Sequence, residues 1–376
     1  MHKIISRAAL GTAAAALAAT LLPASPALAA DPKWRLFQVN TAKVVGSDVN
    51  QINDVAAVNT KDVWAVGDVE RGNLDHSVAQ RWNGRKWVAT TLPKEFRRSS
   101  SSKWNNQLHV VTASSAKNAW AFGTSRAGGS ARHLYALRWD GKAWKSQKRW
   151  KTDDWFTDAV TFGPKDVWAF GENLDSAWHY NGRSWTRTKL PGFSIEKVSA
   201  LSPTDIWAVV NSGSSKGVAR YDGKTWRRVP LPQIADDMFS GPEYMTVHAR
   251  SAKEVWLGGG RNVRVNGEMV QYPIALRWDG KTWQRFDGPR NGYWNAGLNS
   301  LLPDGKGGFW AVRNEQDVVR FSGGKWTATA LPKVKGKRTV ARDLFTIPGS
   351  TSLWATGLLK WGGYPATNGV ILKYSR

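Results

Sequence analysis

The side chains best suited to catalysis do not form a recognisable catalytic pattern in this chain. Its His residues lack the His-Glu-x-x-His spacing of a zinc site, and neither a Gly-x-Ser-x-Gly nucleophile motif nor a phosphate-binding loop is present. The absence of Cys excludes disulfides, thiolate metal sites and a Cys nucleophile. Adjacent carboxylates occur at Asp153-Asp154 and Asp236-Asp237, but sequence neighbours seldom face each other as an acid–base pair must. We expect no catalytic residue, no metal and no cofactor.

Aromatic and basic side chains offer more chemistry. The chain has 23 Trp, and 53 Lys and Arg against 29 Asp and Glu, which gives a formal net charge of +24. The apolar faces of aromatic rings can stack on sugar rings, and a positive surface attracts polyanions. Which of these side chains are free to bind a ligand depends on the elements that carry them.

A repeat of two blocks accounts for most of the Trp. The first block, Asp-Val-Trp-Ala-Val-Gly at residues 62–67, has seven copies whose Trp lie 39 to 56 residues apart. The second block, Arg-Trp-Asn-Gly-Arg-Lys-Trp at residues 81–87, has close copies at residues 138–144 and 277–283. Its Asn-Gly or Asp-Gly dipeptide favours a two-residue hairpin turn, because these residues tolerate a positive φ. The repeat therefore predicts four antiparallel strands per unit.

Four antiparallel strands repeated at this spacing are typical of a β-propeller. In the first unit we expect strands at residues 52–58, 62–68, 77–82 and 87–91. The seventh copy lacks a fourth strand, whereas residues 33–39 have the sequence of a fourth strand without a unit before it. We predict an all-β, seven-bladed β-propeller with four antiparallel strands per blade, the last blade being closed by the N-terminal strand beside Tyr374.

The N-terminal segment has the order of a secretory signal peptide. Lys3 and Arg7 precede an apolar run, and residues 27–29 (Ala-Leu-Ala) form a small-x-small cleavage site. We assign residues 1–29 to the signal peptide and residues 30–376 to the propeller. Removal of the signal peptide takes away two positive charges and lowers the net charge from +24 to +22. We expect a secreted, extracellular protein that does not insert into a membrane.

Seventeen of the Trp occupy fixed positions of the repeat, with seven in second strands, three in third strands and seven in fourth strands. A buried Trp removes about 150–250 Å² from water. We interpret these rings as hydrophobic layers between neighbouring blades, which leaves six Trp for other roles.

The lengths of the connections identify a variable face. Turns between strands one and two, and hairpins between strands three and four, are short and similar. The other connections vary, and the long ones are expected at residues 92–106, 230–243, 262–271 and 331–338. Because strand direction alternates, both variable sets lie on the same side of the disc. Variable loops on a rigid scaffold commonly carry binding sites.

The candidate ligand-binding residues lie in or beside these connections. Aromatic rings gathered there could stack on a carbohydrate, and the basic residues could contact an anionic ligand. The same rings could instead pack the long loops against the scaffold, and the sequence leaves this alternative open. The candidates are Trp104, Trp155, Trp294, Trp361, Tyr244, Tyr364, Arg97 and Arg98.

The positive charge has two interpretations. Outside a cell it would attract acidic wall polymers or acidic polysaccharides, and we expect no nucleic-acid partner. Many Lys and Arg, however, recur at fixed repeat positions, where they would discourage edge pairing of outer strands. The charge therefore need not be a binding feature.

The Asp-Val-Trp-Ala-Val-Gly and Arg-Trp-Asp-Gly-Lys-x-Trp pattern resembles that of the Trp-rich seven-bladed propellers secreted by actinobacteria. Within that group it is similar to the propeller lectin subunits of Streptomyces umbrella toxin particles. The resemblance covers residues 31–376. It implies a lectin that presents a target-binding surface in a particle for interbacterial competition, while another subunit carries the toxin.

These observations lead to an expected function. We expect a secreted, non-enzymatic, lectin-like protein that recognises a cell-surface glycan or an anionic wall polymer, as the targeting subunit of a multiprotein toxin particle with other secreted subunits. Two alternatives stay open. One is a secreted lyase or glycoside hydrolase that acts on acidic polysaccharide, and the other is a scaffold that binds only proteins.

Overall fold

The structure is a computed structural model, and the predicted signal peptide at residues 1–29 lies outside the residues it describes. The described residues are 32–39, 49–71, 74–96, 104–127, 132–151, 154–171, 175–213, 215–234, 241–290, 296–361 and 364–375.

The described chain consists of strands and one short 3₁₀ helix, η1 (Lys94–Phe96), and the strands fall into seven antiparallel groups of four, here called units 1 to 7. Units 1 to 4 comprise β2 (Val49–Asn59), β3 (Asp62–Arg71), β4 (Leu74–Trp82) and β5 (Trp87–Ala89); β6 (Trp104–Ser115), β7 (Asn118–Ala127), β8 (His133–Trp139) and β9 (Trp144–Lys151); β10 (Phe156–Gly163), β11 (Asp166–Gly171), β12 (Ser176–Tyr180) and β13 (Trp185–Lys189); and β14 (Ser194–Ser202), β15 (Asp205–Asn211), β16 (Lys216–Tyr221) and β17 (Trp226–Val229). Units 5 to 7 comprise β18 (Glu243–Ser251), β19 (Glu254–Val265), β20 (Glu268–Trp278) and β21 (Trp283–Asp287); β22 (Leu298–Pro303), β23 (Phe309–Arg313), β24 (Asp317–Ser322) and β25 (Lys325–Thr329); and β26 (Arg338–Thr346), β27 (Leu353–Trp361), β28 (Tyr364–Ser375) and β1 (Lys33–Val39).

The fourth strand of unit 7 comes from the N-terminal end of the described chain. β1 pairs antiparallel with β28, and Trp34 lies opposite Tyr374, as predicted from the sequence. Units 2 to 6 are separate four-stranded sheets, whereas units 7 and 1 are joined by one parallel pair between Asn50 and Asn368. The two ends of the described chain therefore meet within unit 7, which is joined to unit 1.

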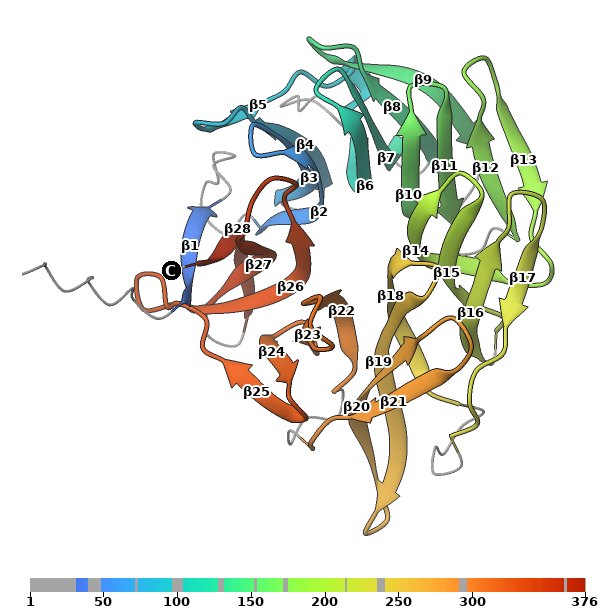
Figure 1. Ribbon diagram of the computed structural model, residues 1–376. Helices are drawn as coiled ribbons and strands as arrows, with labels where there is room; N and C mark the ends of the chain where they lie inside the picture. Colours follow the sequence, from blue (N-terminus) through green and yellow to red (C-terminus); the bar gives the residue numbers. More distant parts are fainter. Residues whose placement is uncertain are drawn as a thin grey trace, which may run out of the picture. The chain divides into compact units, whose positions relative to one another are not determined.

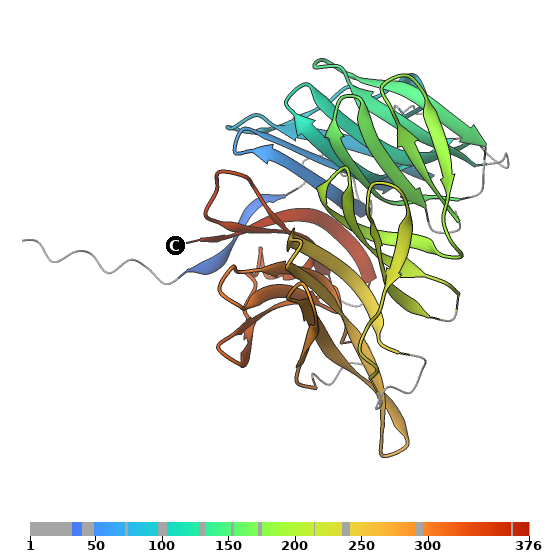
Figure 2. The ribbon, with the colours of Figure 1, turned by 45° about the vertical axis from the view of Figure 1, so that its right-hand side comes forward.

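Within residues 32–375 the units follow one another around a common centre, with the first strand of each unit innermost (Figure 1). These first strands are in contact in chain order, β2 with β6 and so on to β22 with β26, and β2 in turn contacts β27 and β28. Figure 2 shows the same arrangement from an oblique direction. The all-β class and the repeated four-stranded antiparallel blades of a propeller are thus confirmed.

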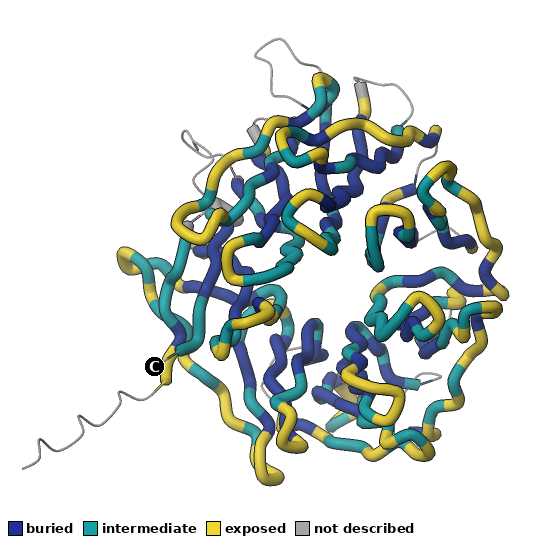
Figure 3. The backbone as a smooth tube through the Cα atoms, turned by 45° about the horizontal axis from the view of Figure 1, so that its top comes forward, coloured by how far each residue is buried: buried dark blue, intermediate teal, exposed yellow. Residues whose placement is uncertain are grey.

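The repeat Trp pack between units. Trp64 of unit 1 belongs to one hydrophobic cluster with Trp139 and Trp144 of unit 2. At another interface Trp34 of unit 7 meets Trp310 of unit 6 edge to face, with ring centroids 6.4 Å apart. The prediction of aromatic layers between neighbouring blades is therefore confirmed, and Figure 3 shows how exposure is concentrated at the turns.

The repeat Arg have a structural role as well. The guanidinium of Arg81 lies 5.2 Å from the ring centroid of Trp64 in its own unit, and Arg220 lies 5.2 Å from that of Trp207. These cation–π contacts place part of the protein's positive charge against Trp rings of the same blade. The architectural interpretation of these repeated charges is thus supported by their positions.

One predicted loop is instead a hairpin. Residues 262–271 were expected to be a long connection, but β19 and β20 continue through them as a projecting two-stranded arm (Figure 1). Asn266 and Gly267 form its turn with φ of 52° and 85°. The Asn-Gly dipeptide that marks the repeat hairpins also explains this one, because both turn residues need a positive φ.

Candidate functional site

A β-bulge occurs at the same register in the first strand of all seven units. In β2, for example, Ile52 pairs with Gly67 and Asp54 with Val66, which leaves Asn53 as the extra residue. The bulge lies near the start of each first strand, at the variable face. A bulge redirects the side chain of its extra residue, and bulges are common next to functional sites. The seven extra residues, called the bulge ring here, are Asn53, His109, Thr157, Glu196, Met245, Asn299 and Arg342.

The repeat Gly explains the bulge in several units. A Cβ on Gly67 would overlap the backbone carbonyl oxygen of Gln51, and one on Gly123 would overlap that of Gln107. Glycine therefore lets the first strand approach the second closely just ahead of the bulge. The last residue of the Asp-Val-Trp-Ala-Val-Gly block thus helps to position the bulge ring.

Side chains of the bulge ring connect neighbouring units. Asn53 Nδ2 donates to the carbonyl oxygen of Leu108 in unit 2 (2.8 Å). Thr157 Oγ1 donates to that of Ile195 in unit 4 (2.7 Å). Two further bonds of this kind run from Asn299 Nδ2 to Met245 Sδ (3.3 Å) and from Arg342 Nη1 to Gln51 Oε1 (2.7 Å).

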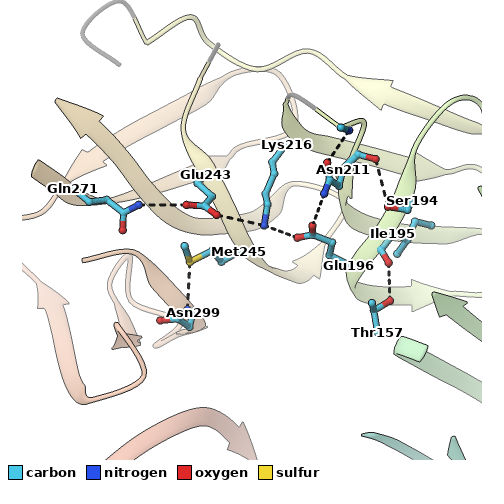
Figure 4. A network of polar contacts seen from close by, with 11 residues as sticks. Thr157, Ser194, Ile195, Glu196, Asn211, Lys216, Glu243, Met245, Gln271 and Asn299 are labelled. Carbon is cyan, nitrogen blue, oxygen red and sulfur yellow. Dashed lines mark hydrogen bonds and ion pairs between the residues drawn. The ribbon is translucent and has the colours of Figure 1, made fainter. Parts of the chain in front are cut away.

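Units 4 and 5 carry a denser polar network, drawn in Figure 4. Lys216 Nζ lies 2.8 Å from Glu196 Oε2 and 3.8 Å from Glu243 Oε1. Asn211 Nδ2 donates to Glu196 Oε1 (3.1 Å), and Gln271 Nε2 donates to Glu243 Oε2 (3.4 Å). A cavity of about 250 Å³ lies against Asn211, Lys216 and Glu243. Alternating donors and acceptors of this kind suit a polyhydroxylated ligand.

A larger cavity of about 510 Å³ is lined by residues of the first strands, four of them from the bulge ring. The residue after the bulge also contributes in six of the seven units, among them Asp54, Asp158 and Ser300. These side chains accept backbone N–H groups of the next unit: Val111 N donates to Asp54 Oδ2 (2.7 Å) and Val198 N donates to Asp158 Oδ2 (2.8 Å). The wall of the cavity is thus built from bonds that hold neighbouring units together.

The charges of this cavity perturb one another. Burial raises the pKa of Asp54 to about 7, although the charge of Lys197 opposes the shift. Burial likewise raises the pKa of Asp158. Enclosure lowers the pKa of Lys197, but the charges of Asp158, Asp343 and Asp54 outweigh it and leave that pKa above its ordinary value. The Lys197 side chain is nevertheless exposed, because the cavity admits solvent around the ammonium.

The structure places only some of the predicted ligand-binding residues. Trp155 has 38% of its surface exposed. The Arg132 guanidinium lies 5.8 Å from its ring centroid. A flat ring with an adjacent cation suits a sugar that bears an anionic group.

The other candidates have different positions. Tyr244 is only 2% exposed and lies in a cluster with Trp207, so we revise its expected role from ligand platform to packing. Trp361 and Tyr364 oppose each other at the end of the β27–β28 hairpin, and Trp104 begins β6. Three candidates, Trp294, Arg97 and Arg98, lie outside the described residues.

The bulge ring was not foreseen, although the sequence contains a signal for it. An amphipathic strand alternates apolar and polar residues, whereas two adjacent polar residues break that period. Such pairs occur at Asn53-Asp54, Thr157-Asp158, Glu196-Lys197, Asn299-Ser300 and Arg342-Asp343, each at the bulge.

Two further features were sought in the described part of the chain. No group of three or more His, Asp and Glu side chains there is arranged to hold a metal ion. None of the helices in the same ranges has the length and apolar character that a membrane crossing requires.

No protein-family model matches the chain, and no curated protein sequence matches it. Its fold is similar to that of YCF48 bound to D1 peptide, with a TM-score of 0.58, 15% identity and coverage of 95% of this chain and 99% of that one. For YCF48 from Cyanidioschyzon merolae the TM-score is 0.53 and the identity 12%, with coverage of 91% of this chain and 98% of that one. For the extracellular domain of a hybrid two-component system protein from B. thetaiotaomicron the TM-score is 0.57 and the identity 11%, with coverage of 91% of this chain and 40% of that one. At these identities the likeness shows the propeller fold alone.

Proposed function

We propose that this chain is a secreted, non-enzymatic, lectin-like protein that binds a cell-surface glycan or an anionic wall polymer at the variable face of a closed seven-bladed propeller. The bulge ring is the observation that carries the proposal. A scaffold of repeated units carries a bulge residue near the start of each first strand, and four of these seven side chains line one polar cavity. This arrangement favours a ligand-binding role for the bulge ring, because the repeated residues alone are enough to form the blades.

Two observations support the closed ring. The first strands contact one another in chain order from β2 to β26, and β2 in turn contacts β27 and β28 of unit 7. β1 supplies the fourth strand of unit 7 and covers the edge of β28. Closure removes exposed sheet edges, which suits a protein without disulfides outside the cell. Secretion itself rests on the signal-peptide pattern of residues 1–29.

The ligand class follows from the side chains at this face. Trp155 offers an apolar platform, and Arg132 beside it offers a cation for a carboxylate or phosphate substituent. The network of Lys216, Glu196 and Glu243 offers donors and acceptors for hydroxyl groups. Together they suit a carbohydrate polymer with scattered negative charges.

A glycan array and a whole-cell binding assay test this proposal. We predict that Trp155→Ala weakens binding about tenfold, since loss of one stacking ring removes about 1 kcal/mol or more. Trp104→Ala and Trp294→Ala extend the test to the remaining candidates. Val88→Ala, at an exposed apolar position on outer strand β5, is the control and should bind normally. Unchanged binding in all three Trp variants would discard the aromatic platform.

The particle and enzyme hypotheses have separate tests. We propose that the projecting β19–β20 arm, where Met269 is exposed, contacts another subunit of a larger secreted toxin particle. Affinity purification from culture supernatant should then recover stable partners, and their absence would count against the particle. Release of unsaturated or reducing ends from uronate polymers would instead favour the lyase or hydrolase.

A further inference from the structure

A second cavity, of about 220 Å³, lies between units 7 and 1. Aromatic rings form most of its wall: Phe37 and Trp354 from unit 7, and Trp82 and Trp87 from unit 1. Thr60, at the turn between β2 and β3, also lines it, which places it toward the face opposite the variable loops. It is therefore independent of the glycan site proposed above.

A bulge in β1 creates the aromatic wall. Leu36 pairs with Leu372 and Gln38 with Ile371, which leaves Phe37 as the extra residue of the strand. Its ring centroid lies 4.7 Å from that of Trp354 and 5.2 Å from that of Trp82, in edge-to-face contacts. The ring thus bridges the two units at the place where both ends of the described chain meet.

A cation stands at the edge of this cavity. Lys373 lines it, and its Nζ lies 5.2 Å from the ring centroid of Trp354. The same arrangement recurs in other units, and in unit 4 the cation also pairs with a carboxylate two residues before the Trp, because Arg220 Nε lies 2.7 Å from Asp205 Oδ1. In unit 7 the position two residues before Trp354 is Ser352, as it is Asn118 in unit 2 and Gly308 in unit 6. Lys373 therefore has no carboxylate at that position.

We propose that this cavity binds a small aromatic carboxylate. A cavity of about 150 Å³ is enough for benzene, so 220 Å³ accommodates a six-membered ring with a short side chain. The ring would contact Phe37, Trp82 and Trp354 edge to face or offset, which are the preferred geometries of aromatic pairs. Its carboxylate would accept a charge-assisted hydrogen bond from Lys373, as the carboxylate of Asp205 does from Arg220 in unit 4.

The position of the cavity gives the ligand a measurable effect. A molecule held between units 7 and 1 contacts the folded ring only, because β1 and β4 are far apart in the unfolded chain. At a free concentration c, such a ligand stabilises the folded state by RT ln(1 + c/Kd), so the melting temperature rises with the logarithm of ligand concentration above Kd. Binding can therefore be followed by calorimetry and by thermal unfolding of the same sample.

Three probes with one ring and different head groups test the proposal: 3-phenylpropionate, 3-phenylpropanol and 3-phenylpropylamine. We expect saturable binding that is tightest for the carboxylate and weakest for the amine. Lys373→Gln should weaken 3-phenylpropionate about tenfold, the usual worth of a charged hydrogen bond, and leave 3-phenylpropanol unchanged. Arg277→Gln is the matched control, because Arg277 occupies the same repeat position over Trp256, 5.6 Å from its ring centroid.

Val63→Phe supplies a second, steric test. Val63 is buried and lines the cavity, so the larger side chain should occupy the space of the ligand and abolish binding of all three probes. If Val63→Phe does not fold, the comparison of Lys373→Gln with Arg277→Gln still tests the proposal. The proposal is overturned if no probe saturates, if Lys373→Gln and Arg277→Gln weaken 3-phenylpropionate equally, or if folded Val63→Phe binds it as the unaltered protein does.

Discussion

At the scale of single residues, the position that follows each bulge serves both packing and charge. Asp54 and Asp158 accept hydrogen bonds from backbone N–H groups of neighbouring units, so both side chains have a structural role apart from any ligand. The cost is a set of carboxyl groups gathered in one cavity, where burial raises the pKa of Asp54 to about 7 and also raises the pKa of Asp158. Lys197 offsets that cost, since it is the cation that lowers the pKa of both carboxyls.

Lys197→Met should therefore destabilise the protein in a pH-dependent way. A carboxyl whose pKa is higher in the folded than in the unfolded chain takes up protons on folding, so its contribution to stability is lost as pH rises from about 4 through its folded pKa. Without Lys197 the folded pKa values of Asp54 and Asp158 rise further. We expect the free energy of unfolding to fall by about 1 kcal/mol at pH 8, after allowance for solvent in the cavity, and by less at pH 5.

Denaturant unfolding at the two pH values checks this expectation. Lys197→Arg keeps the charge and should retain most of the stability, whereas Lys224→Met, at an exposed hairpin turn, should show no difference between pH 5 and pH 8. An equal loss at both pH values in Lys197→Met would mean that the side chain acts by packing instead of by charge.

At the scale of elements, hairpins were predictable from sequence and bulges were not. The turn at Asp140 forms because its Oδ1 accepts the N–H groups of Lys142 and Ala143 while Gly141 adopts a φ of 98°, all of which are local effects. The bulge at Asn53 depends instead on the approach of two strands and on contacts with the next unit. The cavity residues and the burial of Tyr244 were missed for the same reason, because loop length carries no information on which rings turn inward.

Gly67→Ala tests the role of the repeat glycine in forming the bulge. The added Cβ would overlap the backbone of β2, so the strand must shift, and we expect a loss of about 2 kcal/mol in the free energy of unfolding. Ligand binding at the variable face should weaken as well, because the shift moves Asn53. The corresponding residue of unit 4 is Val210, which pairs with Ile195. The first strand of that unit therefore leaves room for a side chain, whereas β2 leaves none at Gly67.

Gly163→Ala provides the matched control for this prediction. A Cβ on Gly163 meets no heavy atom within 4 Å, and the change should leave the free energy of unfolding within about 0.5 kcal/mol of its original value. Denaturant unfolding and the glycan-binding assay should be run on both variants. If Gly67→Ala matches Gly163→Ala in both assays, close approach of the strands is not what the repeat glycine provides.

At the scale of the whole molecule, the interface between units 7 and 1 differs from the others. Elsewhere a single stretch of chain builds each blade, whereas unit 7 takes β1 from the opposite end of the described chain. The meeting of the two ends therefore joins the first and last units by strand pairing, whereas units 2 to 6 are separate sheets. It also places the only bulge of β1 beside the aromatic cavity, so closure and the proposed small-molecule site depend on the same seven residues.

A chain that begins at Val49 should therefore be much less stable than one that begins at Asp31. The shorter chain loses Trp34, which is 4% exposed and contacts both Trp310 and Tyr374, and it bares the edge of β28. Loss of one buried Trp costs about 3–5 kcal/mol, so we expect the melting temperature to fall by roughly 5 °C or more and aggregation to increase through the open edge. A synthetic peptide of residues 32–39 should restore part of the loss by pairing with β28. Equal melting temperatures for the two chains would contradict ring closure by β1 and, with it, the aromatic cavity.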